Sequence, residues 1–239
     1  SIAPSAFCPR SSTGSANGLK NLTSVSIPAS VTSIGDHAFT NCSALTTVRI
    51  NTDGNLTTIG DYAFDNCQKL ATLRLNTNGK LTSIGTYAFS ECEALTTLTI
   101  PDGVTTIGER AFFSCEGITD MTIPDSVTSV GREAFEWLSS LKNLTIPGEL
   151  DTRDWLWCAS SVESVTFTGT RVVSIPRTVN SSGGINYSDM PGRNVKRVVI
   201  SEGITTIEPY AFYRSNLITE VVLPEGLLTM GERAFSNCN

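Results

Sequence analysis

A pattern of about 23 residues recurs along the chain, and this repeat constrains the fold more than any other feature. Whole copies of the pattern open at seven positions, which are Leu22, Leu45, Leu70, Leu95, Ile118, Val195 and Ile218. Two further units, opening at Leu141 and Val162, keep the first half of the pattern and lose the second. Because repeat periods of roughly 20 to 50 residues are typical of stacked architectures, the sequence predicts a solenoid of about nine coils.

The first half of each unit has the alternation of a β-strand. In the unit that opens at Leu45, Val48 and Ile50 are apolar, whereas Thr47 and Arg49 are polar. Side chains of a strand alternate between two faces, so the apolar set should face the core and the polar set should face solvent. A turn rich in proline follows, or a longer Asn-Thr-x-Gly version that accounts for the 25-residue units.

The second half of the unit predicts another short strand and a closing turn. Leu56 and Ile59 form an apolar pair, and Gly60 suits a sharp corner after it. Asp61 stands where a short helical or 3-10 turn would begin, which is a favourable place for negative charge. An Ala-Phe pair follows in each whole unit. We expect its phenylalanines to form one buried aromatic stack, made of Phe39, Phe64, Phe89, Phe112, Phe135, Phe212 and Phe235.

The units must fold together, because no single unit has enough apolar surface to fold alone and neighbouring coils have to cover one another. We expect residues 1–21 to be an N-terminal partial repeat or cap. Residues 22–239 form the predicted repeat domain, with degenerate coils and an insertion at 150–194. Since the last coil has no visible polar cap, we expect either that sequence beyond Asn239 is missing or that this end docks onto another surface.

Five of the seven cysteines share one repeat position, three residues after the phenylalanine: Cys42, Cys67, Cys92, Cys115 and Cys238. Leu138 occupies this position in another unit, so the position accepts a buried hydrophobic side chain. We expect packed free thiols, and pairing between adjacent coils is the alternative, since the spacing of stacked coils does not forbid it. Cys8 and Cys158 lie outside this repeat position, and the sequence does not predict whether they are paired. No zinc site is expected, because the spacings are those of the repeat and no CxxC or histidine pair accompanies them.

Charge and hydropathy exclude two classes of partner. The formal net charge is -6 and the sequence pI is near 4.9, so the chain lacks the basic surface that neutralises nucleic-acid phosphates. No apolar run approaches the roughly 18 residues that a membrane span requires. We therefore expect no nucleic-acid binding and no membrane insertion by this chain.

The pattern LxxVxIPxxVTxIGxxAFxxC, clear in seven units between Leu22 and Cys238, resembles the BspA-like leucine-rich-repeat family of bacterial and protist surface proteins. The resemblance implies a leucine-rich-repeat solenoid, a right-handed parallel β-rich coil stack with short helical or 3-10 turns and about nine coils. It also implies an extracellular or cell-surface location and association with adhesion and host or matrix binding. The stretch from Leu150 to Asn194 departs from the pattern, and no adhesion motif can be transferred residue by residue.

No catalytic constellation is found. The sole histidine, His37, shares its repeat position with Tyr62, Arg110 and Glu133, which indicates a solvated surface position. No nucleophile elbow, paired carboxylates or phosphate-binding loop occurs, and the Gly183-Gly184 doublet lacks the strand and helix that such a loop needs. We therefore expect a protein that is not an enzyme, with no cofactor and no bound metal.

The outward positions of the first strands form the first candidate binding surface. Arg49 and Arg74 fall at one repeat position in adjacent units, and Thr99 and Thr122 follow them in the next two. Such regularly spaced surfaces are where solenoids usually bind. The alternative is that threonine fills these positions because it favours strands.

The irregular units supply the second candidate. All three tryptophans, Trp137, Trp155 and Trp157, occur in or next to the unit that opens at Leu141. Exposed aromatics can anchor a ligand. Equally, they can fill a coil that has lost its phenylalanine, with Trp155 in that place. The insertion from Gly169 to Asn194 is expected to protrude as a loop, and long loops are often functional.

The sequence thus favours a non-enzymatic cell-surface or secreted binding protein that engages an extracellular protein or carbohydrate ligand through the solenoid surface. The alternative is a structural spacer that holds another domain of a longer protein.

Overall fold

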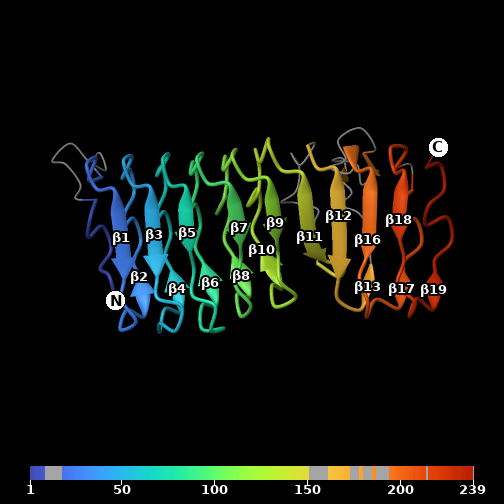
Figure 1. Cartoon of the computed structure of the whole chain (residues 1–239), viewed down its shortest axis with the longest axis horizontal. Coiled ribbons are helices and arrows are strands. Elements are labelled where there is room, and N and C mark those ends of the chain that lie inside the picture. The colour runs from blue at the N-terminus through green and yellow to red at the C-terminus, as the bar shows by residue number, and fades with distance from the viewer. Residues whose placement is uncertain are drawn as a thin grey trace.

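A computed structural model describes residues 1–8, 18–150, 161–172, 178–179, 185–186, 194–213 and 215–238. The described chain winds into an elongated stack of coils, with the two termini at opposite ends of the long axis (Figure 1). Within these residues no α-helix occurs, and nearly all regular structure is short strand. The predicted β-rich coil stack is therefore confirmed.

The first half of each unit contributes a strand to a continuous side of the stack, which we call the first ribbon. In the described residues this ribbon has nine strands: β1 (Ser24–Ile27), β3 (Thr47–Ile50), β5 (Thr72–Arg74), β7 (Thr97–Thr99), β9 (Asp120–Thr122), β11 (Asn143–Pro147), β12 (Ser164–Thr168), β16 (Arg197–Ile200) and β18 (Glu220–Val222). Their pairing is parallel throughout and divides into two sheets, β1-β3-β5 and β7-β9-β11-β12-β16-β18. The nine strands agree with the predicted number of coils.

The second apolar pair of each unit forms a shorter parallel ladder. Its strands are β2 (Ser33–Ile34), β4 (Thr58–Ile59), β6 (Ser83–Ile84), β8 (Thr106–Ile107), β10 (Ser129–Val130), β13 (Arg171–Val172), β17 (Thr206–Ile207) and β19 (Thr229–Met230). Within the described residues the ladder forms two groups, β2-β4-β6-β8-β10 and β13-β17-β19. Residues 151–160, where the unit that opens at Leu141 would supply its strand, lie outside the described residues.

The third side of the whole coils is a chain of tight turns and not the short helical turn that the sequence led us to expect. His37 and Asn41 adopt φ angles of 57° and 61°, and the equivalent described residues of the other whole coils are also left-handed. Between them the N–H of Phe39 donates to the carbonyl of Ala63 in the next coil, 2.7 Å away. Alternating left-handed residues turn the backbone outward to the neighbouring coil, whereas a helix would bond to itself.

The acidic residue at the corner serves this inter-coil bonding. Asp36 Oδ1 accepts from the backbone N–H of Asp61 at 2.9 Å, and Asp61 Oδ1 accepts from Thr86 N–H at 2.7 Å. Each carboxylate therefore accepts a hydrogen bond from a backbone N–H group of the following coil. The sequence had predicted that these acidic residues stand at the start of a short helical turn.

The core contains the predicted aromatic stack. Phe7, Phe39, Phe64, Phe89, Phe112 and Phe135 stack in sequence, with successive ring centroids 4.7, 4.9, 5.2, 5.3 and 5.5 Å apart. After residues 151–160, which are not described, Phe167 meets Phe212 edge to face at 5.7 Å, and Phe235 stacks on Phe212 at 4.6 Å. The described part of the stack is thus continuous from Phe7 to Phe135.

The cysteine column packs beside the phenylalanines. Cys42, Cys67, Cys92 and Cys115 are buried free thiols, as expected from the acceptance of leucine at this position. The Sγ of Cys67 donates to the carbonyl of Phe39 in the preceding coil at 3.3 Å. Cys92 and Cys115 form the equivalent hydrogen bonds to the phenylalanine carbonyls of the coils before them. Burial raises the pKa of the Cys67 thiol well above its usual range, so this side chain stays protonated.

The apolar side chains of the first coil are covered by other residues, whereas several of those in the last described coil are exposed. Ile2 forms a parallel bridge with Ile34, and Phe7 begins the aromatic stack, so residues 1–8 cover the first coil as the second half of a repeat. In the last coil, Leu228 and Met230 are 83% and 50% exposed, whereas Ile207, which pairs with Met230, is buried.

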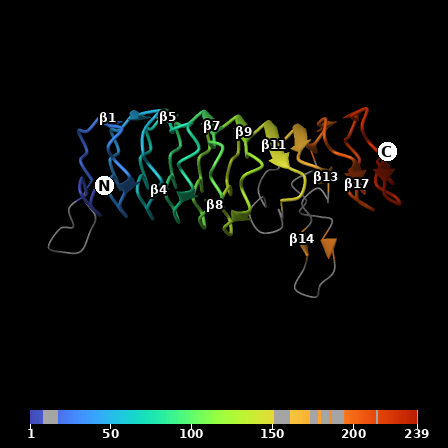
Figure 2. The ribbon, with the colours of Figure 1, turned by 90° about the horizontal axis from the view of Figure 1, so that it is seen from below.

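The expected protruding insertion contains a described strand pair. β14 (Thr178–Val179) and β15 (Ile185–Asn186) pair antiparallel, and they project from the stack on the side away from the first ribbon (Figure 2). In the described part of the chain no helix is long and apolar enough to cross a membrane.

Candidate binding surface on the first ribbon

The predicted column of outward side chains forms as one line across the first ribbon. Parallel pairing places Ser26 opposite Arg49 and Arg49 opposite Arg74. On the other side of the break, Thr99 pairs with Thr122 and Thr122 with Thr145. All of these side chains are exposed except that of Thr145, which is half-buried. They face solvent because side chains alternate along a strand, and their neighbours, such as Val48 and Leu98, face the core.

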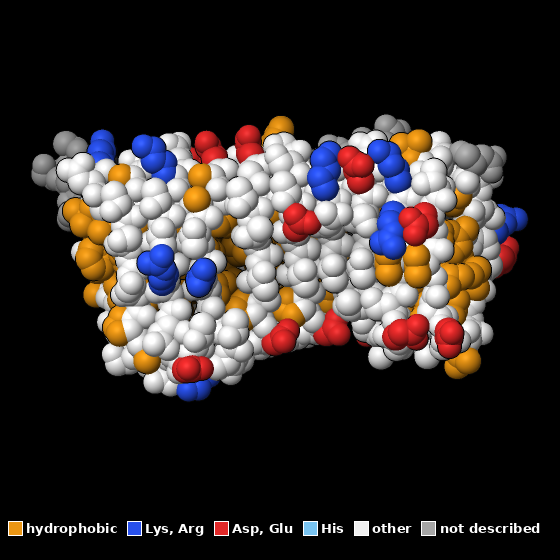
Figure 3. Space-filling model, viewed as in Figure 1, with side chains coloured by type: hydrophobic (Ala, Val, Ile, Leu, Met, Phe, Trp, Pro, Cys, Tyr) orange, Lys and Arg blue, Asp and Glu red, His pale blue; other side chains and the backbone are white. Residues whose placement is uncertain are grey.

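The arginine pair has no partner within the described residues. Neither guanidinium group forms an ion pair or hydrogen bond with another described side chain. Two like charges directly opposite on neighbouring strands repel each other. The fold therefore gains nothing electrostatically from Arg49 and Arg74, which are opposite each other in the β3-β5 ladder of the first ribbon, on the face that Figure 3 shows.

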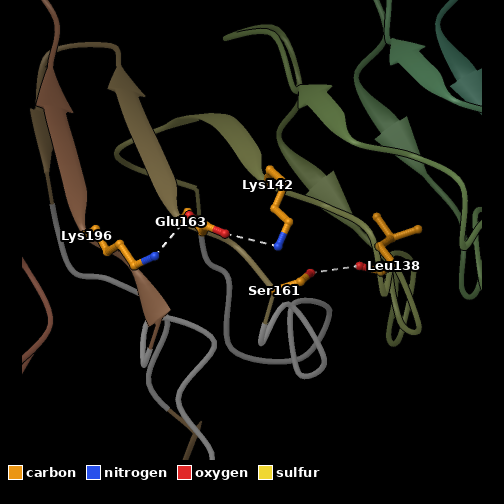
Figure 4. A network of polar contacts seen from close by, with 5 residues as sticks. All are labelled: Leu138, Lys142, Ser161, Glu163 and Lys196. Atoms are coloured by element: carbon orange, nitrogen blue, oxygen red, sulfur yellow. Dashed lines mark hydrogen bonds and ion pairs between the residues drawn. The ribbon is translucent and has the colours of Figure 1, made fainter.

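Several charged side chains near the later strands of this ribbon form ion pairs with one another. Lys142 Nζ and Lys196 Nζ each lie 3.1 Å from a carboxylate oxygen of Glu163 (Figure 4), and these lysines lower the pKa of that carboxyl. Arg197 Nε lies 3.0 Å from Glu220 Oε2. The arginine pair on β3 and β5 thus differs from these residues, each of which has a partner of opposite charge.

The arginine pair also lies beside a break in the sheet. β5 and β7 belong to different sheets, and Figure 1 shows a wider separation between them than between other neighbours. Leu73 on β5 is partly exposed, whereas the equivalent Val48 and Leu98 are 0% and 3% exposed. The opening falls where a 25-residue unit meets a 23-residue unit.

A groove runs along the corner that follows the first ribbon, and the sequence analysis missed it. Two cavities of about 330 and 520 Å³ share Asp125, and their linings contain Asp102, Asp125 and Glu149 with several threonines, Thr99 and Thr122 among them. Thr168 Oγ1 donates to Asp125 Oδ1 at 2.5 Å. The Pro-Asp dipeptides at 101–102 and 124–125, one repeat apart, were the signal that could have predicted an acidic edge here.

The tryptophans do not join the arginines. Trp137 is 53% exposed and lies in the turn segment of its coil, on a different side from the first ribbon. Trp155 and Trp157 lie outside the described residues, so the predicted aromatic cluster and the alternative core plug both stay predictions.

His37 begins an ordered ladder on the turn side. Its ring stacks on Tyr62 with centroids 4.7 Å apart, Tyr62 stacks on Tyr87 at 4.8 Å, and Arg110 covers Tyr87. Arg110 also pairs with Glu133. The position is half-buried and packed, and so is more structured than the predicted solvated surface. Among the described residues, no group of three or more His, Cys, Asp or Glu side chains is placed to hold a metal ion.

The repeat, the two parallel ladders and the turn side define a leucine-rich-repeat solenoid. The chain belongs to the BspA type leucine rich repeat family, whose model matches in six copies over residues 16–80, 74–182 and 183–239. A comparison with curated proteins finds no match.

Solved structures agree with this fold. A leucine-rich repeat protein from Bacteroides ovatus is similar with a TM-score of 0.50 and 22% identity, over 93% of this chain and 74% of that one. The pneumococcal vaccine antigen PcpA is similar with a TM-score of 0.55 and 20% identity, over 96% of this chain and 63% of that one. At these identities the likeness supports the fold alone.

Proposed function

We propose that this chain is a non-enzymatic cell-surface or secreted binding module that engages an extracellular protein or glycan through its first ribbon. The observation that carries the proposal is the exposed arginine pair, Arg49 and Arg74, which lies in register on adjacent strands and has no counter-charge among the described residues. Membership of a family of leucine-rich repeats, whose solenoids generally act as non-enzymatic binding scaffolds, supports the same reading.

An array of extracellular-matrix proteins and glycans tests this function. We expect the wild-type chain to bind at least one component and an Arg49→Ala/Arg74→Ala variant to lose most of that binding while keeping its melting temperature. An elongated stack would also serve as a spacer. If neither protein binds any component of the array, the spacer is the better description. Retention of full binding by the variant would move the binding surface away from the first ribbon.

A further inference from the structure

The structure assigns no internal role to the charges of Arg49 and Arg74, and this points to a ligand that carries the opposite charge. Each arginine stands on a strand of the first ribbon with its side chain exposed, and the two are directly opposite in the β3-β5 ladder. Adjacent strands lie about 4.8 Å apart, so the two guanidinium groups can reach one group between them. In a chain with a net charge of -6, this is a local basic site on an acidic molecule.

We propose that Arg49 and Arg74 form an anion clamp for a sulfated polysaccharide chain lying across β3 and β5. This inference rests on the proposed function and names its ligand class. A guanidinium group offers a planar fork of donors that binds oxyanions through two parallel hydrogen bonds. A sulfate half-ester presents three terminal oxygens, enough for a fork from one arginine and a further bond from the other, whereas a carboxylate presents only two.

The surroundings of the pair favour a polysaccharide over an acidic protein. Thr47, Thr72 and Thr97 flank the arginine column on the same outward face. Their hydroxyl groups can donate to and accept from sugar hydroxyls. Protein hot spots are dominated by large side chains such as tryptophan, tyrosine and arginine. Among the described residues, none of the strongly exposed large hydrophobic side chains belongs to β3, β5 or β7.

The carboxylates of the corner groove limit where such a chain can lie. Asp102 and Asp125 line the groove below β7 and β9, and no lysine or arginine lines it with them. In Figure 3 acidic side chains lie along part of the lower edge of this face. An anionic chain is repelled there, so the footprint runs over the early coils of the ribbon and does not continue into the groove.

The test uses surface plasmon resonance with immobilised heparin, chemically desulfated heparin and a polyglutamate peptide, at physiological salt. Arg49→Gln/Arg74→Gln removes the clamp. Lys142→Gln/Lys196→Gln is the matched control, because it removes two positive charges from the same ribbon where Glu163 already pairs with both. We expect heparin binding to weaken about 30-fold or more in the arginine variant. In the lysine variant we expect a change of less than about threefold. Desulfated heparin should bind wild type weakly.

Three results would overturn the inference. Equal losses in the two variants would mean that binding follows net charge and not the clamp. Polyglutamate binding as tightly as heparin would indicate an acidic protein ligand. Absence of heparin binding would reject a sulfated ligand. In that last case, a component bound on the matrix and glycan array would leave the proposed function standing, whereas an array without binding would reject both. Equal melting temperatures of the three proteins would exclude unfolding as the cause of a loss.

Discussion

At the residue scale, stacking gives every copy of a repeat position the same neighbours, so a departure at one position has a local cost. Asp65 is such a departure. Its equivalent in the preceding coil is Thr40 and in the following coil Ser90, both neutral. Burial raises the pKa of the Asp65 carboxyl from 3.8 to about 6, with the nearby Glu91 charge adding to the effect.

The charge of Asp65 should therefore oppose folding at neutral pH. Because the folded pKa lies above the unfolded value, the folded chain binds the proton more tightly between pH 3.8 and about 6, and stability falls as pH rises through this window. We expect Asp65→Asn to stabilise the protein by about 1 kcal/mol at pH 7.5, after allowance for partial exposure. The gain should vanish near pH 4, as measured by urea unfolding at both values. A gain of the same size at both pH values would contradict the burial of this charge.

The thiol column gives a second prediction at the residue scale. Thiolates, and not thiols, react with disulfide reagents, and burial raises the pKa values of Cys42, Cys67 and Cys92. In a Cys158→Ser/Cys238→Ser variant, five of the seven cysteines remain. We expect none of the five to react with Ellman's reagent in the folded protein and all five to react in guanidinium chloride. Fewer than five in denaturant would instead indicate pairing between adjacent coils.

At the element scale, the ribbons and the turns respond differently to the change in coil length. β6 and β8 pair in the second ladder although β5 and β7 do not pair in the first. The corner between them is closed by glycine. Gly103 has a φ of +106°, and a Cβ there would lie 2.4 Å from the carbonyl oxygen of Gly79. The two coils thus touch at their turns where the strands have separated.

Gly103→Ala should therefore destabilise the protein by roughly 1 to 3 kcal/mol, from the left-handed backbone and the clash with Gly79. The matched control is Gly226→Ala, whose added Cβ would meet nothing within 4 Å and whose φ is not positive. We expect the control to be neutral or slightly stabilising. Thermal unfolding of both variants checks this, and similar melting temperatures would show that the corner adapts.

At the scale of the whole molecule, each coil contacts mainly its neighbours, so stability is approximately a sum of local terms. Within the described residues, the first ribbon links the coils before and after residues 151–160, because β11 and β12 pair over five residues each.

Truncation of the aromatic core in one coil should therefore act mainly on the nearby coils. Phe64→Ala and Phe212→Ala each remove a fully buried ring, at a cost of about 3 to 5 kcal/mol. By hydrogen exchange with mass spectrometry, we expect Phe212→Ala to accelerate exchange in residues 195–238 and to leave residues 22–118 unchanged. Phe64→Ala should do the reverse. Acceleration across the whole chain in both variants would mean that the solenoid unfolds as one cooperative unit.

The number of coils and the inward or outward position of each side chain within a coil could be predicted from the sequence. The repeat period predicted the number of coils, the alternation in Leu45–Ile50 predicted which side chains face inward, and the Phe and Cys positions predicted buried columns. It also placed Arg49 and Arg74 on one outward column. These features depend on spacing within one unit, and strand periodicity expresses that spacing directly.

The contacts between neighbouring coils could not be predicted in this way, because they depend on how the coils stack in space. Neither the opening between β5 and β7 nor the acidic groove at Asp102 and Asp125 follows from one unit, because both depend on how turns of different length stack. On the turn side, left-handed residues such as His37 form backbone hydrogen bonds to the next coil. The sequence of a single unit predicts a helical turn on a solvated surface there. Only the spatial arrangement distinguishes Lys142 and Lys196, which both pair with Glu163, from the unpaired arginines. Charge pairing across coils is a long-range property, and residue spacing within one repeat does not encode it.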